Sequence, residues 1–427
     1  MSYPQPNSKP NGFSPARRRW LRAGLAAGAL AATGGAAVVL AQPKIFNPCL
    51  SDLPDDLAGH PLVAAAWRGL DPTMVWDCHA HLAGTGDGGH GIVMSPDMLS
   101  PLNPLQYIQR LFYLNAGCVH QAPGRVDDSY VERLHNLSDG MAPGYKTMLF
   151  AFDRAHAADG TPLPDKSALY VPNSYARDVA RATPERFEWV CSIHPYRADA
   201  LDALAQAAAE GARAVKWLPP AMGIDPASPA CDPFYRALVE LDLPLITHVG
   251  EEQAVHGAGR PEWSNPLHLR RALDHGVRVV MAHCASIGED VDLDKGANGP
   301  RVPSFALFDR MMGEDRYKAL LFGDISAIEL RNRRIEVVRT IIEREDWHPR
   351  LLYGTDYPLP GILPLISPAA FAHEGMLDEA AVPVLEEIRA HNPLLFTFVL
   401  KRHLSSHGRR LPASVFETRR FFDRTTA

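Results

Sequence analysis

The chain has 427 residues, of which 46% are hydrophobic and 22% charged, an ordinary globular composition that supports a large core. Its 43 basic residues are outnumbered by 49 acidic ones and its formal net charge is -6, which argues against a nucleic-acid partner. The six cysteines include no CxxC pair, so neither a zinc ribbon nor a redox motif is indicated, although an oxidising compartment permits disulfides.

The N-terminal segment has the composition of a targeting signal. Residues 16–22 read ARRRWLR, which resembles a twin-arginine export signal, and residues 23–41 carry no charge. Small side chains around Ala41 fit cleavage after that residue. We therefore expect residues 1–41 to engage the twin-arginine export machinery, and the protein to be periplasmic or otherwise exported. An uncleaved anchor in the inner membrane is the alternative, because the uncharged stretch is just long enough to span a bilayer.

Short apolar runs follow a proline-rich lead-in at residues 42–73. From residue 74 onward these runs alternate with amphipathic helical patterns. Eight runs are predicted to be strands: residues 75–81, 146–152, 188–193, 213–218, 244–249, 277–283, 319–325 and 350–355. The runs are almost continuously apolar, which is typical of parallel strands covered on both faces.

Helical patterns lie between the strands. They cover residues 196–211, 232–241, 266–276, 305–312, 333–345 and 379–390. Strand–helix alternation over about 320 residues predicts an α/β fold, a (β/α)8 TIM barrel at residues 74–427. The connection after the first strand is elaborated, with a glycine-rich loop at 84–91 and a helical pattern at 104–118. Such an elaboration falls on the catalytic face, so we expect it to shape the pocket; a surface excursion is the alternative.

Polar side chains gather at the carboxyl ends of these strands, where such barrels carry out their chemistry. The first strand carries His79 and His81, which share one face because side chains alternate along a strand. The same end of other predicted strands carries Lys216, His248, His283 and Asp356. Buried polar groups are costly unless they are paired, and one metal ion satisfies several of them at once.

Weaker candidates follow the same strands. His194 comes after the third strand and Glu251 after the fifth, and both are predicted to line the pocket and bind substrate. Asp324 and Ser326 lie at the end of the seventh strand. Loop polarity or helix capping is the alternative explanation for each of them.

The order of these motifs resembles the amidohydrolase superfamily: HxH on the first strand, histidine on the fifth and sixth, and GTDYP on the eighth. The similarity is strongest to the branch that contains aminocarboxymuconate-semialdehyde decarboxylase, related aromatic-acid decarboxylases and lactone hydrolases. The resemblance implies one divalent ion, zinc in first place and manganese as the alternative, held by His79, His81, His248 and Asp356. It also implies that Asp356 accepts a proton from water and that His283 polarises the substrate or shuttles a proton.

Lys216 has two interpretations. In binuclear members of the superfamily a lysine on the fourth strand is carboxylated and bridges two metals, which implies a second ion. In the branch resembled here the site holds one ion, and Lys216 then binds a substrate carboxylate or forms a structural ion pair. We favour the second interpretation.

Three functions are compatible with this site. The first is a metal-dependent hydrolase of an ester, lactone or amide in a small substrate, either aromatic or carboxylated. The second is a non-oxidative decarboxylase of an aromatic or unsaturated carboxylic acid, and the third is a non-catalytic metal-binding envelope protein. Export favours hydrolysis, because decarboxylases of the resembled branch serve cytoplasmic catabolism. A non-catalytic role is disfavoured because every expected metal-ligand position is occupied by a suitable residue. Barrels related to the resembled family are often dimers, so a homodimer is one expected state.

Overall fold

The computed structural model describes residues 45–255 and 257–424, so the export segment predicted at residues 1–41 lies outside the described residues. The chain divides into two units, Met1–Phe46 and Asn47–Ala427, and the fold described below is that of the second unit. Among the described residues, no helix is both long and apolar enough to cross a membrane.

Two parallel sheets form the centre of this unit. One has the order β1-β3-β5 and consists of β1 (Trp76–His81), β3 (Lys146–Phe150) and β5 (Phe187–Val190). The other has the order β12-β11-β8-β7-β6 and consists of β6 (Val215–Trp217), β7 (Leu245–Thr247), β8 (Val279–Met281), β11 (Leu321–Asp324) and β12 (Leu351–Leu352). Single parallel bridges join the sheets at both edges, Cys191 to Val215 and Ala80 to Tyr357. A strand overlaps each of the eight predicted ranges.

The strands end earlier than predicted where the candidate residues begin. His283, Cys284 and Ala285 follow β8 with φ values of 56°, 50° and 51°, and Asp356 follows β12 with a φ of 60°. These left-handed conformations are uncommon for residues with a Cβ and cost about 1–2 kcal/mol each. The backbone therefore leaves the sheet at His283 and Asp356, so simple strand alternation no longer sets the direction of their side chains.

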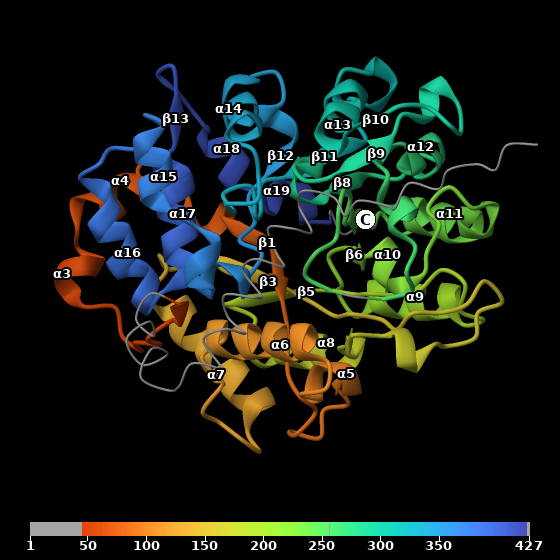
Figure 1. The fold of residues 1–427 in the computed structure, drawn as a ribbon, viewed down its shortest axis with the longest axis horizontal. Helices are drawn as coiled ribbons and strands as arrows, with labels where there is room; N and C mark the ends of the chain where they lie inside the picture. The colour runs from red at the N-terminus through yellow and green to blue at the C-terminus, as the bar shows by residue number, and fades with distance from the viewer. Residues whose placement is uncertain (1–44, 256, 425–427) are drawn as a thin grey trace, which may run out of the picture. The chain divides into compact units, whose positions relative to one another are not determined.

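Helices lie outside the strands, as Figure 1 shows for α9, α11, α13 and α14. Six of them overlap the predicted helical patterns: α9 (Ala200–Ala209), α11 (Asp232–Glu240), α12 (Arg270–Asp274), α13 (Ser304–Met312), α14 (Ile335–Glu343) and α16 (Ala381–His391). In α14 the buried residues Val337, Val338, Ile341 and Ile342 repeat at helical spacing, so one apolar face packs inward. The helical pattern predicted at 104–118 appears as α6 (Pro104–Ala116), and the lead-in contains α4 (Pro61–Trp67).

Other elements were not predicted. The long ones are α7 (Val126–Asp139) and α8 (Asn173–Ala182). A further long helix, α17 (Pro393–His403), follows Asn392, where the family resemblance implies a closing helix. The short helices are α3 (Asp55–Ala58), α5 (Pro96–Leu99), α10 (Pro219–Met222), α15 (Pro368–His373), α18 (Ala413–Phe416) and α19 (Arg419–Phe422). Three antiparallel pairs join β2 (Val93–Met94) to β4 (Leu169–Tyr170), β9 (Glu289–Val291) to β10 (Arg301–Pro303), and β13 (Ser405–Ser406) to β14 (Arg409–Arg410).

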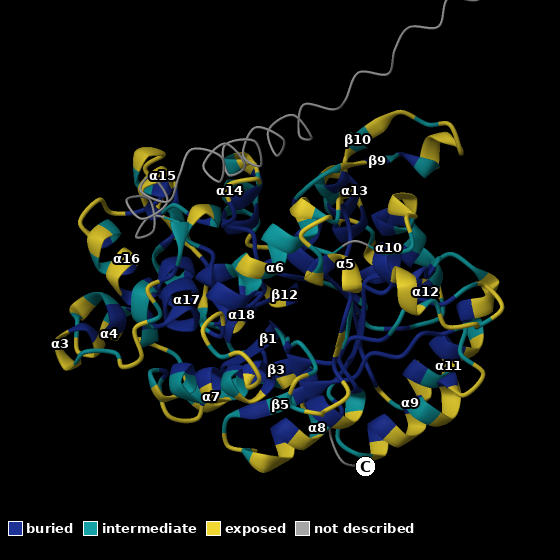
Figure 2. Ribbon diagram, turned by 60° about the horizontal axis from the view of Figure 1, so that its bottom comes forward, coloured by how far each residue is buried: buried dark blue, intermediate teal, exposed yellow. Residues whose placement is uncertain are grey.

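The buried helix α17 supports the site from behind. Most of its residues are buried, as its dark blue ribbon in Figure 2 shows. Nζ of Lys401 lies 2.7 Å from Oε1 of Glu329, and both side chains are 0% exposed. The same Nζ donates to the carbonyl oxygen of Gly354 at 3.1 Å. A Cβ added at Gly354 would lie 2.8 Å from Cβ of His79, so only glycine lets this segment approach β1 so closely.

The elaborated connection after β1 is fastened at the end of α6. A disulfide joins Cys118, just beyond α6, to Cys49 in the lead-in. On the preceding turn, the hydroxyl of Tyr113 donates to the carbonyl oxygen of Ala254 at 2.6 Å. Ala254 belongs to the connection that follows β7, so α6 contacts a loop at the carboxyl ends of the strands.

Candidate active site

The end of β1 presents two imidazole rings to one carboxylate. Oδ1 of Asp356 lies 3.4 Å from Nε2 of His79 and 3.2 Å from Nε2 of His81. One ligand atom from each residue lies within 4.8 Å of the others, a spacing that allows one metal ion to bind all three. The His79 side chain is 1% exposed and that of His81 is 28% exposed, so the group is accessible from the His81 side.

Asp324, at the end of β11, orients the His79 ring. Its Oδ2 lies 2.9 Å from Nδ1 of His79. Because an ionised carboxylate only accepts, Nδ1 carries the proton and Nε2 presents its lone pair to Asp356. Burial raises the pKa of Asp324, but the neighbouring His79 and His283 and the hydrogen bonds from His79 and Ser326 outweigh it and hold that pKa below its usual value. Burial lowers the pKa of His79 to about 4, which keeps the imidazole neutral, as metal binding requires.

We predict that Asp324→Asn weakens metal binding about 10- to 100-fold while the fold is retained, because partners of this kind orient the ligand ring. The measurement is a titration of metal-loaded protein with a chelator. Asp315→Asn is the matched control, since that carboxylate is 88% exposed and pairs with Lys318 on the surface. Equal metal affinity in the two variants would contradict an orienting role for Asp324.

His283 lies on the other side of Asp356. Its Nδ1 is 3.0 Å from the backbone oxygen of Ser326, so Nδ1 donates and Nε2 keeps its lone pair. Nε2 lies 3.9 Å from Oδ2 of Asp356. Burial lowers the pKa of His283, which favours the neutral ring. The two oxygens of Asp356 therefore face different partners, Oδ1 the β1 histidines and Oδ2 His283. A second group with ligand spacing joins His283 to His79 and Asp324.

His248, the third predicted histidine ligand, lies beside this group. Its ring centroid is 5.5 Å from that of His283, and its Nε2 is 3.4 Å from Oε2 of Glu252. That Nε2 is buried and makes no hydrogen bond within the described residues. A buried imidazole nitrogen without a partner is a group that a metal ion satisfies. Three imidazoles and a carboxylate fit zinc or manganese, and the ligand role of His248 stays a prediction.

Lys216 is buried in the centre of the site. Its Nζ lies 3.1 Å from Nε2 of His79 and 5.0 Å from the ring centroid of Phe150. Burial lowers its pKa, although nearby carboxylates such as Asp324 oppose the shift. The amine thus contacts the nitrogen that would bind metal, and it forms no ion pair with a carboxylate in the described part of the chain. The predicted structural ion pair is therefore wrong, whereas its predicted role in substrate binding is not tested by this position.

The structure does not bring His194 and Glu251 into this group. Nε2 of His194 lies 3.0 Å from the carbonyl oxygen of Met222, and its Nδ1 accepts from the backbone N–H of Tyr196 at 3.2 Å. Both ring nitrogens are therefore occupied, against the prediction that His194 binds substrate. Glu251 is exposed, and the neighbouring Glu252 lies beside His248 instead. The available sequence signal for this contact was the four-residue spacing between His248 and Glu252. The backbone is no longer extended after β7, so side chains at that spacing can lie next to each other.

Asp77 was missed by the sequence analysis. Its Oδ1 accepts from the backbone N–H groups of Thr355 and His79, at 2.8 and 3.1 Å. The hydroxyl of Thr355 donates to Oδ2 at 2.5 Å. Burial raises the pKa of Asp77 to about 7, against these hydrogen bonds. Asp77 thus fastens β1 to the segment that carries Asp356, and its position two residues before His79 in an apolar strand was the available signal.

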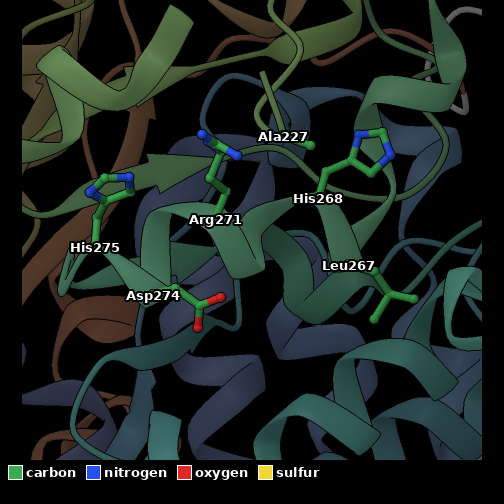
Figure 3. Close-up of a pocket in the computed structure, with 6 residues that line it drawn as sticks. All are labelled: Ala227, Leu267, His268, Arg271, Asp274 and His275. Carbon is green, nitrogen blue, oxygen red and sulfur yellow. The ribbon is translucent and has the colours of Figure 1, made fainter. Parts of the chain in front are cut away.

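A separate cavity of about 360 Å³ lies near α12. Figure 3 shows the side chains that line it. It is lined by Ala227, Leu267, His268, Arg271, Asp274 and His275. Arg271 forms hydrogen bonds of 2.6 and 2.7 Å to Asp232, and His275 lies 3.0 Å from the same carboxylate. None of the lining residues belongs to the strand-end group, so we assign the chemistry to that group and not to this cavity.

The sequence match identifies the class of protein. Residues 76–373 match the family model described as amidohydrolase, and the chain belongs to this family. The predicted resemblance to the amidohydrolases is therefore confirmed. A search of curated protein sequences finds no match.

Solved structures of similar architecture include both hydrolases and decarboxylases. A protein provisionally described as 2-pyrone-4,6-dicarboxylic acid hydrolase, from Pseudomonas putida, is 16% identical with a TM-score of 0.38, over 76% of this chain and 97% of that chain. A 5-carboxyvanillate decarboxylase from Novosphingobium aromaticivorans, complexed with manganese and 4-hydroxy-3-methoxy-5-nitrobenzoic acid, is 13% identical with a TM-score of 0.38, over 82% and 96%. The IDCase of Metarhizium anisopliae is 11% identical with a TM-score of 0.44, over 84% and 98%. The family follows from the sequence match, and both reactions are compatible with it.

Proposed function

We propose that this protein is a metal-dependent hydrolase of an ester, lactone or amide in a small substrate. The observation that carries the proposal is the group His79, His81 and Asp356, with Asp324 holding His79 in the tautomer that metal binding needs. A divalent ion, zinc in first place and manganese as the alternative, makes water more acidic and polarises a carbonyl when bound.

The side chains of the site accept and transfer protons and hold one another in position. Asp356 directs Oδ1 to the β1 histidines, and its Oδ2 is the atom that accepts a proton from the attacking water. Nε2 of neutral His283, 3.9 Å from Oδ2, takes that proton from Asp356 and then passes it to the leaving group, or it accepts a hydrogen bond from the substrate. Asp324 orients the His79 ring, and Asp77 fastens β1 to the segment that carries Asp356.

We also propose that the eight parallel strands form a (β/α)8 barrel. Support comes from the bridges Cys191–Val215 and Ala80–Tyr357, which join the two sheets at both edges. Support also comes from the site, whose groups follow the carboxyl ends of β1, β8, β11 and β12 as in barrels of this kind.

Export to the periplasm is a further part of the proposal. The twin-arginine pattern at residues 16–22 supports it, and so does the disulfide between Cys49 and Cys118, because disulfides persist in oxidising compartments. Cleavage after Ala41 is the favoured outcome, with retention as a membrane anchor as the alternative.

The test of the reaction measures acid release and carbon dioxide release in parallel. Zinc-loaded protein is offered phenyl esters, aromatic lactones and hydroxybenzoic acids. We expect acid release without carbon dioxide, and we expect Asp356→Asn to lower the rate about 10²- to 10⁴-fold because it removes the proton acceptor. The exposed-site variant Asp315→Asn should match the unaltered protein. Carbon dioxide release without acid would overturn hydrolysis and establish the decarboxylase alternative.

A further inference from the structure

Helix α6 turns polar side chains towards the protein and apolar side chains towards solvent. Its inward side carries Gln106, Gln109, Arg110 and Tyr113, whose spacing places them on one helical face. Nε2 of Gln109 donates to the carbonyl oxygen of Gln253 at 3.1 Å. Oε1 of Gln106 and Nε of Arg110 are buried. A surface helix of a globular protein normally turns its apolar face to the core, so packing within this unit does not explain the pattern of α6.

The outward side of α6 belongs to a continuous run of exposed leucines. Leu105 is 62% exposed, and Leu111, also exposed, lies on the same side of the helix. Helix α5 lies beside α6 (Figure 1), and it ends at the exposed Leu99. Leu102, in the turn between the two helices, is 90% exposed. We call Leu99, Leu102, Leu105 and Leu111 the leucine surface.

The leucine surface is apolar and almost free of charge. Eight large hydrophobic side chains are exposed in the described part of the chain, and half of them belong to this surface. Residues 88–124 contain only two residues of the types Asp, Glu, Lys and Arg, namely Asp97 and Arg110. Asp97 accepts a hydrogen bond from Nδ2 of Asn103 at 2.9 Å, and Nε of Arg110 is buried. An exposed apolar patch of this kind marks a contact with another molecule, and this one offers few ion pairs to a charged partner.

Two features favour a lipid bilayer as that partner. Leu102 projects from its turn, and a projecting apolar side chain enters fluid lipid without needing a matching pocket. The second feature is where the export segment joins the fold. Cys118, just beyond α6, is disulfide-bonded to Cys49, which lies only eight residues after Ala41. Eight extended residues span no more than about 29 Å, so an anchor at residues 23–41 keeps this end of α6 near the membrane.

We propose that the leucine surface rests on a phospholipid bilayer, with Leu102 and its neighbours below the headgroups. The inference uses the proposed export and does not depend on the reaction. An anchored chain holds this contact permanently, whereas a chain cleaved after Ala41 makes it reversibly, because a few leucines alone bind lipid weakly. Since α6 also contacts the loop after β7, the bound protein carries its site close to the lipid surface.

The test reports the surroundings of one side chain in the full-length protein, so binding through the export segment does not confound it. The four free cysteines are buried, so Leu102→Cys accepts an environment-sensitive fluorophore at one position. The labelled protein is titrated with vesicles of phosphatidylethanolamine and phosphatidylglycerol. We expect the emission to shift to shorter wavelength as the label enters lipid. Leu201→Cys on α9 is the matched control, because Leu201 is 46% exposed outside the leucine surface, and its label should not shift.

A charge placed on the leucine surface supplies the second measurement. Leu105→Glu in the protein labelled at residue 102 should raise the lipid needed for half of the shift about tenfold or more, because a carboxylate must then enter the interface. Leu201→Glu should leave the titration unchanged, and thermal unfolding establishes that every variant is folded.

Three outcomes would overturn the proposal. The first is no shift at residue 102, and the second is an equal shift at residues 102 and 201. The third is a shift at residue 102 that grows with protein concentration in the absence of vesicles, which would assign the leucine surface to a second copy of the chain.

Discussion

His79→Ala is expected to lose bound metal and activity together, whereas His283→Ala is expected to keep the metal and lose about 10²- to 10⁴-fold in rate. The difference follows from geometry. His79 presents Nε2 to Asp356 with its ring fixed by Asp324, while Nε2 of His283 faces the second oxygen of Asp356 at 3.9 Å. The measurement is elemental analysis of protein purified without chelator, together with rates on the same preparations.

The unaltered protein should contain about one ion per chain. Two ions per chain would instead support a carboxylated Lys216 that bridges them. Loss of metal from His283→Ala would contradict the assignment of a single site around His79, His81 and Asp356. His407→Ala is the control, because its side chain is 77% exposed and pairs only with Glu343 on the surface.

Lys401→Met is expected to lower the free energy of unfolding by about 3–5 kcal/mol, because it leaves a buried carboxylate without its counter-charge. Lys401 and Glu329 are both 0% exposed, and the ammonium also donates to Thr397 and to the carbonyl oxygen of Gly354. Urea unfolding of the metal-loaded protein measures the loss.

Two further variants test whether the loss of stability comes from breaking the buried ion pair or from removing a lysine in general. Lys401→Met combined with Glu329→Leu should recover most of the lost stability, since no charge then remains buried. Lys318→Met removes the exposed partner of Asp315 and should change stability by no more than about 1 kcal/mol. If Lys401→Met were as mild as Lys318→Met, the buried pair would not be an important support of the site.

The local pattern of apolar residues predicted the central strands well. It gave no helical period for a helix that is buried on all sides. The eight apolar runs all contain strand, because parallel strands covered by helices need continuous apolar side chains. Helix α17 shows no helical period in the sequence, because apolar side chains occupy every face of its largely buried run PLLFTFVLKRH. The polar helix α7 was also missed, although Val126, Tyr130, Leu134 and Leu137 form a buried stripe at helical spacing.

In the site, residues on a regular strand were predictable, and residues beyond the ends of the strands were not. His79 and His81 were predictable because strand alternation fixes both side chains, and the structure brings them together with Asp356. The positions of Glu252 and His194 were not, because each lies beyond the end of its strand where the direction of the side chain depends on the bend.

The disulfide between Cys49 and Cys118 has a consequence for the chain before it folds. The two cysteines are 69 residues apart, and the covalent ring that they close contains β1, with both of its histidines, as well as α6. Closing a ring of this size removes conformational freedom from the unfolded chain, worth about 4 kcal/mol. Once the cystine has formed, it confines β1 and α6 to one small volume. This holds even when every non-covalent contact between the strand with the first two histidines and the helix that contacts the β7 loop is broken.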